Sequence, residues 1–189
     1  IATTANIQGL TEKIKEADIL VLAVKPQQFK EAAAELLSVF NQSPNKPLCL
    51  SVAAGIRTQD MARWLNHTRL IRAMPNTPAL IGQGMTGLFA SNEATQEDRN
   101  NAESICSAVG KITWVQNEKQ IDDITAVSGS GPAYVFAFLE ALESAGVAQG
   151  LTPEQARLLA SQTVIGAATL ATQSTETPAV LRERVTSKG

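Results

Sequence analysis

The sequence contains few aromatic residues and a single histidine. Aromatic residues make up 4% of the 189 residues, and the formal net charge is -2 with acidic and basic residues interspersed. Nucleic-acid binding needs a basic surface, so nucleic acid is not expected as a partner. His67 lies between polar neighbours and is expected to be solvated. The sequence offers no Ser/His/Asp set, Cys/His pair or metal-ligand cluster, which disfavours the common hydrolases and predicts no metal site.

Long apolar runs are missing too. No run approaches the roughly 18 residues of a membrane span, so no membrane association is expected. The two cysteines, Cys49 and Cys106, lie in apolar or helical patterns without metal-ligand spacing, and we interpret them as reduced core residues of a cytoplasmic protein. With 44% hydrophobic and 18% charged residues, the chain can bury a substantial core.

Strand and helix patterns alternate in the first part of the chain. The apolar run 19–24 is typical of a parallel strand covered on both faces. Further strands are predicted at 48–53, 70–74, 85–90 and, as an edge strand, 112–115. This alternation predicts βαβ crossovers and a mostly parallel sheet, a partial Rossmann-type α/β fold.

Three helices are expected between these strands. The first starts at Pro26, the second is capped by Thr58, and the third follows a capping box formed by Thr95 and Asp98. Their predicted core sides carry Phe29, Ala33, Leu36, Leu37 and Phe40 in the first, Met61, Ala62 and Leu65 in the second, and Ala102, Ile105, Cys106 and Val109 in the third.

After Val115 only helix patterns remain. They cover 121–127, 133–149, 152–172 and a short segment from Thr177. We therefore predict a partial dinucleotide-binding domain at 1–117 and an all-helical dimerisation and substrate domain at 118–189. The segments 133–142 and 158–170 are too apolar for so few helices, so a homodimer or higher homo-oligomer through these helices is expected.

The segment Ser128-Gly129-Ser130-Gly131-Pro132 is the most informative motif. Its glycines predict a sharp bend, and Pro132 suits the first turn of a buried helix because its missing N–H has no partner there. Two hydroxyls beside the N–H groups of a helix start predict an uncharged pocket for a carboxylate or phosphate.

Small residues follow three of the predicted parallel strands, at 23–26, 53–55 and 73–78. Ligands of open parallel sheets bind beyond the carboxyl ends of the strands, so these segments favour a nucleotide site, to which Lys25 adds one positive charge. The fingerprint Gly-x-Gly-x-x-Gly is absent, so we expect the first βαβ unit of such a domain to lie outside this sequence.

Four segments together resemble the pyrroline-5-carboxylate reductase family. They are Leu-Ala-Val-Lys-Pro (22–26), Ser-Val-Ala-Ala-Gly (51–55), Arg-Ala-Met-Pro-Asn-Thr-Pro (72–78) and Ser-Gly-Ser-Gly-Pro-Ala-Tyr (128–134). The resemblance implies an oxidoreductase that reduces pyrroline-5-carboxylate to proline, the last step of proline biosynthesis. It implies hydride transfer from NADPH, with NADH as the alternative, to the C=N carbon of the cyclic imine. It also implies a Rossmann domain followed by a helical dimerisation domain.

The resemblance implies roles for particular residues. Those expected to line the cofactor are Ala23, Val24, Lys25, Pro26, Ala53 and Ala54. Those expected to face the substrate are Asn76, Thr77, Ser128, Ser130, Gly131 and Glu176. No proton donor or other catalytic side chain is assigned. The family's Ser-Pro-Gly-Gly-Thr-Thr appears only as Ser187-Lys188-Gly189, so the sequence is interpreted as a fragment that lacks part of the active site.

Two other functions remain open. One is a two-domain NAD(P)-dependent dehydrogenase of the 3-hydroxyacid type, although the lysine expected on its helix is missing between Pro132 and Gly150. The other is a nucleotide-binding protein without catalytic turnover.

Overall fold

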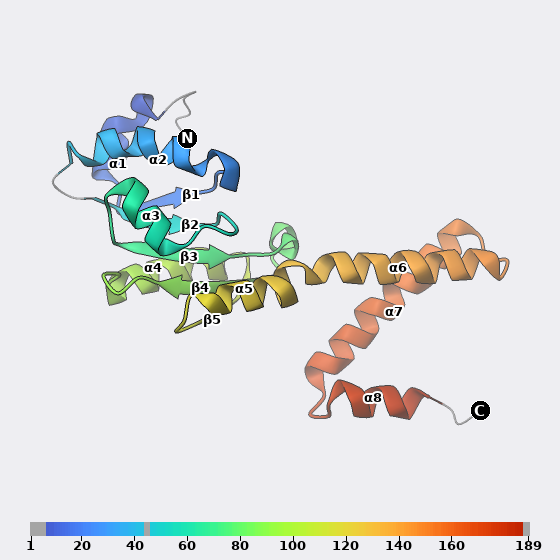
Figure 1. Ribbon diagram of the computed structural model, residues 1–189. Helices are drawn as coiled ribbons and strands as arrows, with labels where there is room; N and C mark the ends of the chain where they lie inside the picture. The colour runs from blue at the N-terminus through green and yellow to red at the C-terminus, as the bar shows by residue number, and fades with distance from the viewer. Residues whose placement is uncertain (1–6, 44–45, 187–189) are drawn as a thin grey trace. The chain divides into compact units, whose positions relative to one another are not determined.

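The computed structural model describes residues 7–43 and 46–186. The chain divides into two compact units, the first ending at Pro132 and the second beginning at Ala133 (Figure 1). Among the described residues, no helix combines the length and the apolarity that crossing a membrane requires. The same residues contain no group of three or more histidine, cysteine or acidic side chains placed to hold a metal ion.

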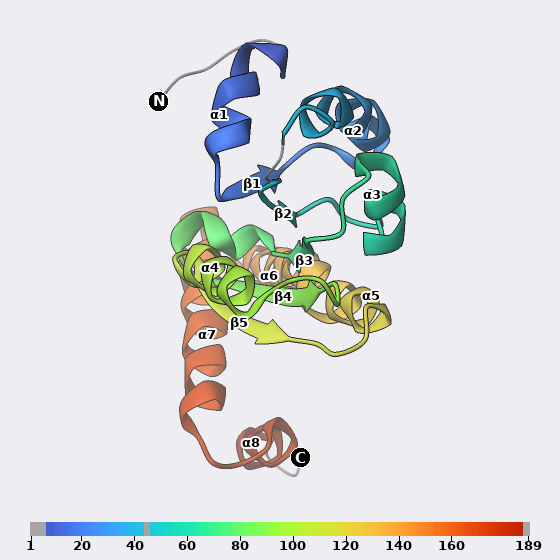
Figure 2. The same ribbon diagram turned by 90° about the vertical axis from the view of Figure 1, so that its left-hand side faces the viewer.

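Five strands form one sheet in the first unit, in the order β1-β2-β3-β4-β5 (Figure 2). They are β1 (Ile19–Leu22), β2 (Leu48–Ser51), β3 (Leu70–Met74), β4 (Gly84–Ala90) and β5 (Gly110–Trp114). β1, β2 and β3 are parallel, with Leu20 beside Cys49 and Leu50 beside Ile71. The five predicted strands are confirmed, within a few residues at their ends.

The sheet is mostly parallel, as predicted, with one antiparallel pair that the sequence pattern does not indicate. β4 runs antiparallel to β3, and β5 is parallel to β4. The connection between β3 and β4 contains only the 3-10 helix η2 (Thr77–Ile81). A parallel crossover needs about a dozen residues or more, so a connection this short turns the chain back.

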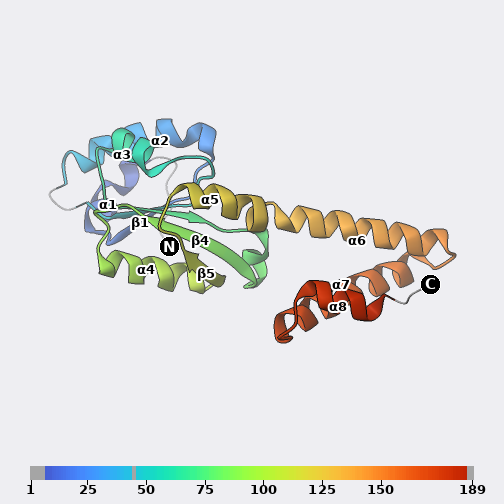
Figure 3. The same ribbon diagram turned by 60° about the horizontal axis from the view of Figure 1, so that its bottom comes forward.

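Helices cover both faces of the sheet (Figure 3). α2 (Pro26–Phe40) and α3 (Thr58–Leu65) lie on one face, and α4 (Gln96–Ser107) lies on the other. Alternate strand residues point to the two layers: Cys49 packs in the core under α2 and α3, whereas Leu50 packs in the core under α4. Before β1, η1 (Gln8–Leu10) and α1 (Thr11–Glu16) add Ile14 to the first core.

The amphipathic pattern of α2 is confirmed, although Leu37 is only partly buried and Val39 is buried instead, whereas the predicted cover of β1 is wrong. α2 starts at Pro26 and buries Phe29, Ala33, Leu36, Val39 and Phe40. β1 is not covered on both faces, because it is an edge strand and its Val21 is 47% exposed.

The capping box that starts α4 is confirmed, but its core side is narrower than predicted. The Thr95 hydroxyl accepts from the Asp98 N–H at 3.1 Å, and the Asp98 carboxylate accepts from the Thr95 N–H at 2.8 Å. Ala102 and Cys106 are buried four positions apart, while Ile105 beside this stripe is exposed. Val109 follows the end of the helix and is also exposed.

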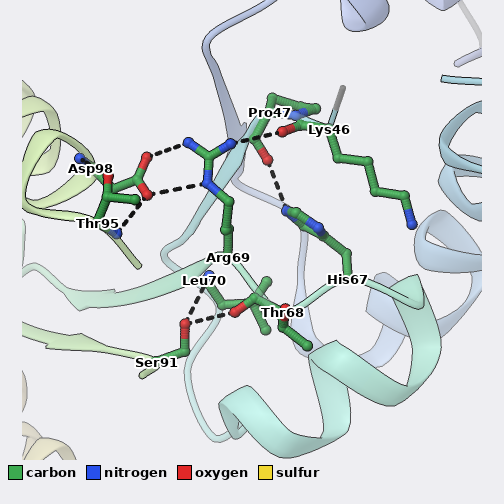
Figure 4. Close-up of polar contacts among 9 residues, drawn as sticks. All are labelled: Lys46, Pro47, His67, Thr68, Arg69, Leu70, Ser91, Thr95 and Asp98. Atoms are coloured by element: carbon green, nitrogen blue, oxygen red, sulfur yellow. Dashed lines mark hydrogen bonds and ion pairs between the residues drawn. The ribbon is translucent and has the colours of Figure 1, made fainter. Parts of the chain in front are cut away.

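His67 is buried, which corrects the prediction of a solvated side chain. Its ring packs edge-on against Phe40 at 5.4 Å between centroids, and Nε2 lies 2.8 Å from the Pro47 carbonyl oxygen. Burial lowers the pKa of His67 below its ordinary value. Beside it, Arg69 forms a two-pronged ion pair with Asp98 (Figure 4).

The second unit is helical. α6 (Gly131–Ala148) runs into it from the end of the first unit, and α7 (Pro153–Gln173) and α8 (Pro178–Val185) follow. The Thr152 hydroxyl caps α7 in a capping box, and the Thr177 hydroxyl caps α8. α6 contains no buried residue, which corrects its expected burial within one chain: Phe136, for example, is 62% exposed.

Candidate active site

The carboxyl ends of β1, β2 and β3 meet at one edge of the sheet, because these neighbouring strands are parallel. Five of the six predicted cofactor residues lie on the two loops that leave β1 and β2 there, and the sixth, Pro26, begins α2. Ala23, Lys25 and Ala54 are exposed, while the side chain of Ala53 is buried. The Ala53 N–H donates to the Ser51 hydroxyl at 3.3 Å, so within this loop Ala54 is the exposed predicted residue.

This edge fits a nicotinamide dinucleotide. Gly55 has φ of 75°, and a Cβ added there would meet no atom within 4 Å, so its backbone faces open space. A flat ring can approach such a backbone closely. Lys25 precedes Pro26 at the start of α2, where a positive charge could pair with a phosphate.

Asn76 connects the loop after β3 to the Ser-Gly-Ser-Gly-Pro segment. Its Nδ2 donates to the Ser128 carbonyl oxygen at 3.0 Å, and its Oδ1 accepts from the Met85 N–H at 2.9 Å. In a regular helix the Ser128 carbonyl would bond the N–H of residue 132, but Pro132 has none. Asn76 thus supplies a donor that the proline removes.

The predicted sharp bend at the two glycines is wrong. α5 (Lys119–Ile124) continues into a π-helical turn, η3 (Thr125–Gly129), and Ser130 keeps right-handed helical angles before α6 begins. The Ser130 N–H donates to the Thr125 carbonyl at 2.8 Å. Single π turns of this kind are frequent at functional sites.

The two serines of the segment differ. The Ser128 hydroxyl donates to the Ile124 carbonyl at 3.2 Å. In the part of the chain that the structure describes, the half-buried Ser130 hydroxyl has no hydrogen-bond partner. Of the two serines, Ser130 therefore has the hydroxyl that is free to bond a ligand.

Two close approaches fix this segment against the sheet. A Cβ on Gly87 of β4 would lie 2.5 Å from Ile124, and a Cβ on Gly129 would lie 3.1 Å from Met74 at the end of β3. Together with the Asn76 bond, these contacts bring the predicted substrate segment to the end of β3.

Comparison with known proteins identifies the family of the chain. A family model described as pyrroline-5-carboxylate reductase dimerisation matches residues 118–189. A pyrroline-5-carboxylate reductase from Arabidopsis thaliana is 47% identical over 178 residues, covering 94% of this chain and 63% of the relative. The solved structure of such a reductase from Coxiella burnetii has a TM-score of 0.84 and 45% identity, covering 99% of this chain and 67% of that one.

The chain belongs to the pyrroline-5-carboxylate reductase family. A further member, the Plasmodium falciparum reductase solved with NADP bound, superposes with a TM-score of 0.81 at 28% identity, covering 92% of this chain and 68% of that one. The chain spans less than two thirds of the length of the Arabidopsis relative. These matches do not favour the 3-hydroxyacid dehydrogenase alternative.

The two remaining substrate-side predictions of the reductase resemblance fall in different units, Thr77 in the first and Glu176 in the second. Thr77 is the exposed first residue of η2, next to Asn76. Glu176 belongs to the second unit, where it pairs with Arg184 and its N–H donates to the Ser174 hydroxyl at 3.0 Å. The final residues Ser187-Lys188-Gly189 lie outside the described residues.

A polar network around the buried Arg72, the Glu118 network, was not predicted from the sequence of this reductase chain. It consists of Arg72, Thr58, the partly buried Glu118 and the exposed Asp122. Thr58 is the first residue of α3 rather than its cap. Its N–H and hydroxyl donate to the Glu118 carboxylate at 2.7 and 2.8 Å. Arg72 pairs with Glu118 at 3.4 Å and with Asp122 at 3.3 Å. A charged residue inside the apolar strand Leu-Ile-Arg-Ala-Met was the available signal.

Proposed function

We propose that the full-length protein reduces pyrroline-5-carboxylate to proline with NADPH, with NADH as the alternative cofactor. The observation that carries this proposal is the bond between Asn76 and Ser128, which joins the loop after β3 to the Ser-Gly-Ser-Gly-Pro segment. The names of the relatives supply the substrate, and NADP in the Plasmodium falciparum structure supports the cofactor.

In this proposal, the loops after β1 and β2 hold the cofactor. The loop backbones at 23–26 and 53–55 support the flat ring, and Lys25 binds a phosphate. When bound, the reduced nicotinamide would supply a hydride to the C=N carbon of the protonated ring imine, which leaves the ring nitrogen as the amine of proline and the nicotinamide oxidised. Asn76 holds the loop after β3 against Ser128, and Thr77 lies on the same loop facing the substrate.

The Ser128–Gly131 segment anchors the substrate carboxylate. The free hydroxyl of Ser130 donates to it, and the backbone at Gly131 allows close approach. We also propose that Glu176, in the second unit, is one of the residues that face the substrate. Positioning of this kind lowers the barrier because the reacting atoms are held at about 3–3.5 Å.

The remaining proposals concern the whole protein. We assign the cofactor domain to 1–117 and the helical dimerisation domain to 118–189, where the family match begins. The helical domain forms a homodimer or higher homo-oligomer through its exposed apolar faces. The two cysteines are buried as free thiols, which supports a cytoplasmic location, where thiols stay reduced. Burial also raises the pKa of the Cys49 thiol to about 12.

The test is a spectrophotometric assay of the full-length protein with NADPH and pyrroline-5-carboxylate. We expect NADPH oxidation that depends on the imine, with proline as the product identified by mass spectrometry. NADPH that binds but is not oxidised by this imine would contradict the enzyme assignment and favour the non-catalytic alternative.

A further inference from the structure

The guanidinium of Arg72 is buried where its strand neighbours are apolar. Its side chain is 2% exposed. Ile71 and Ala73 point into the core under α4, so Arg72 points to the opposite face, toward α3 and α5. A buried charge is costly unless it is paired and hydrogen-bonded. Glu118 and Asp122 provide that pairing.

Glu118 uses its carboxylate on other elements. It is the residue that precedes α5, but it makes no capping bond to that helix. Instead it accepts from the first N–H and the hydroxyl of α3, through Thr58, and from Arg72 on β3. One side chain therefore ties together α3, β3 and the start of α5.

The three partners in the Glu118 network, Thr58, Arg72 and Asp122, each lie on an element that is continuous with one segment of the candidate site. Thr58 directly follows the loop after β2, which carries Ala53 and Ala54. Arg72 lies on β3, which leads to Asn76. Asp122 lies on α5, which continues through η3 to the Ser128–Gly131 segment.

We propose that Glu118 is a positioning residue that couples the cofactor loop after β2 to the substrate segment at Asn76 and Ser128–Gly131. This role rests on the proposed function. Glu118 touches neither ligand: it sets the separation of the two loops through Thr58 on one side and Arg72 on the other. Hydride transfer is sensitive to that separation, since a misplacement of about 1 Å can reduce the rate about 100-fold.

The two arms predict separable kinetic effects. Thr58→Val removes the hydroxyl bond and should raise the Kd for NADPH about 3- to 10-fold while the KM for the imine stays within about twofold. Arg72→Met should instead raise the KM for the imine or lower kcat about 10- to 100-fold with less effect on NADPH. Glu118→Ala should change both, and Glu118→Gln, which keeps an acceptor for Thr58, should spare NADPH binding.

The experiment uses the full-length protein, with NADPH binding followed by fluorescence titration and imine reduction by steady-state kinetics. Asp123→Ala is the matched control. Asp123 neighbours Asp122 on α5, but its side chain is exposed and forms no hydrogen bond or ion pair in the described part of the chain. If Arg72→Met does not fold, Arg72→Lys replaces it, since lysine keeps the charge but loses the two-pronged geometry.

A merely structural role would lower the melting temperature of these variants without the split between NADPH and imine constants, and that result overturns the proposal. Wild-type protein that binds NADPH without reducing the imine refutes the proposed function alone. The network is then judged on NADPH binding: a raised Kd in Thr58→Val and Glu118→Ala supports it, and unchanged values overturn it. Wild-type protein that binds no NADPH overturns both.

Discussion

At the residue scale, the buried His67 couples folding to pH. Folding favours its neutral form, since burial lowers its pKa and the nearby charges of Lys46 and Arg69 act in the same direction. The neutral ring's contribution to stability is complete above the ordinary histidine pKa of about 6.5 and is lost progressively as pH falls below it.

We therefore expect the free energy of unfolding to decrease between pH 7.5 and 5.5, and His67→Gln to reduce that decrease. Glutamine cannot take up a proton but can donate to the Pro47 carbonyl. Losing the ring contact with Phe40 should cost about 1–3 kcal/mol at pH 7.5. Urea titrations at several pH values measure both effects. Equal pH dependence in wild type and variant would mean that His67 does not titrate differently on folding.

Lys25 and Ser130 should affect different ligands. Ser130→Ala removes the free hydroxyl and should raise the KM for the imine about 10-fold or more, because hydrogen bonds to charged groups contribute about 1.5–3 kcal/mol. Lys25→Ala should raise the Kd for NADPH about 3- to 10-fold, since an exposed charge on a phosphate contributes less. Steady-state kinetics and NADPH titration separate the two constants. The opposite pattern would mean that the two sites are interchanged.

Residue types were easier to predict than their partners. Asn76 and Ser130 could be selected from motifs in the sequence, but the bond from Asn76 to the Ser128 carbonyl depends on Pro132, 56 positions later in the same fold. His67 has polar neighbours in sequence and apolar neighbours in space, so its burial was not visible locally. The burial of Arg72 likewise depends on partners distant in sequence, Glu118 just before α5 and Asp122 within it.

At the element scale, the π turn η3 depends on Asn76. Asn76→Asp keeps an acceptor for the Met85 N–H but places a carboxylate oxygen against the Ser128 carbonyl. We expect η3 to loosen, the KM for the imine to rise about 10-fold, and the free energy of unfolding to fall about 1–3 kcal/mol. Hydrogen exchange over residues 125–131 and kinetics measure this. Asn92→Asp, at an exposed residue without a bond in the described chain, is the control. Unchanged exchange would show that Asn76 does not hold the turn.

Elements were predictable where the signal is local. The capping boxes before α4 and α7 and the apolar stripe of α2 give the start and buried face of these helices from a few neighbouring residues. Strand direction is not local in this sense. β4 and β5 reverse because the segment after β3 is too short for a crossover, and the helix through Ser128–Gly131 continues because contacts from Met74 and Asn76 support it.

At the scale of the whole molecule, the exposed apolar side chains of the second unit need cover. Both helices are rich in apolar residues, and many of these are exposed to solvent: Phe136 on α6 is 62% exposed and Leu158 on α7 is 70% exposed. α6 and α7 pack closely where Gly146 meets Ala156, but two helices cannot bury all their apolar faces on each other. A second copy of the chain would bury these faces.

Phe136→Glu should therefore dissociate the homo-oligomer of the full-length protein. A buried, unpaired carboxylate at an interface costs several kcal/mol, so the dissociation constant should rise at least about 100-fold. Sedimentation velocity at several concentrations measures the mass of the assembly. Gln149→Glu adds the same charge at an exposed position beyond the end of α6 and should leave the mass unchanged. A Phe136→Glu protein that is folded and keeps the wild-type mass would place the interface elsewhere, because a face that tolerates a carboxylate is in contact with water.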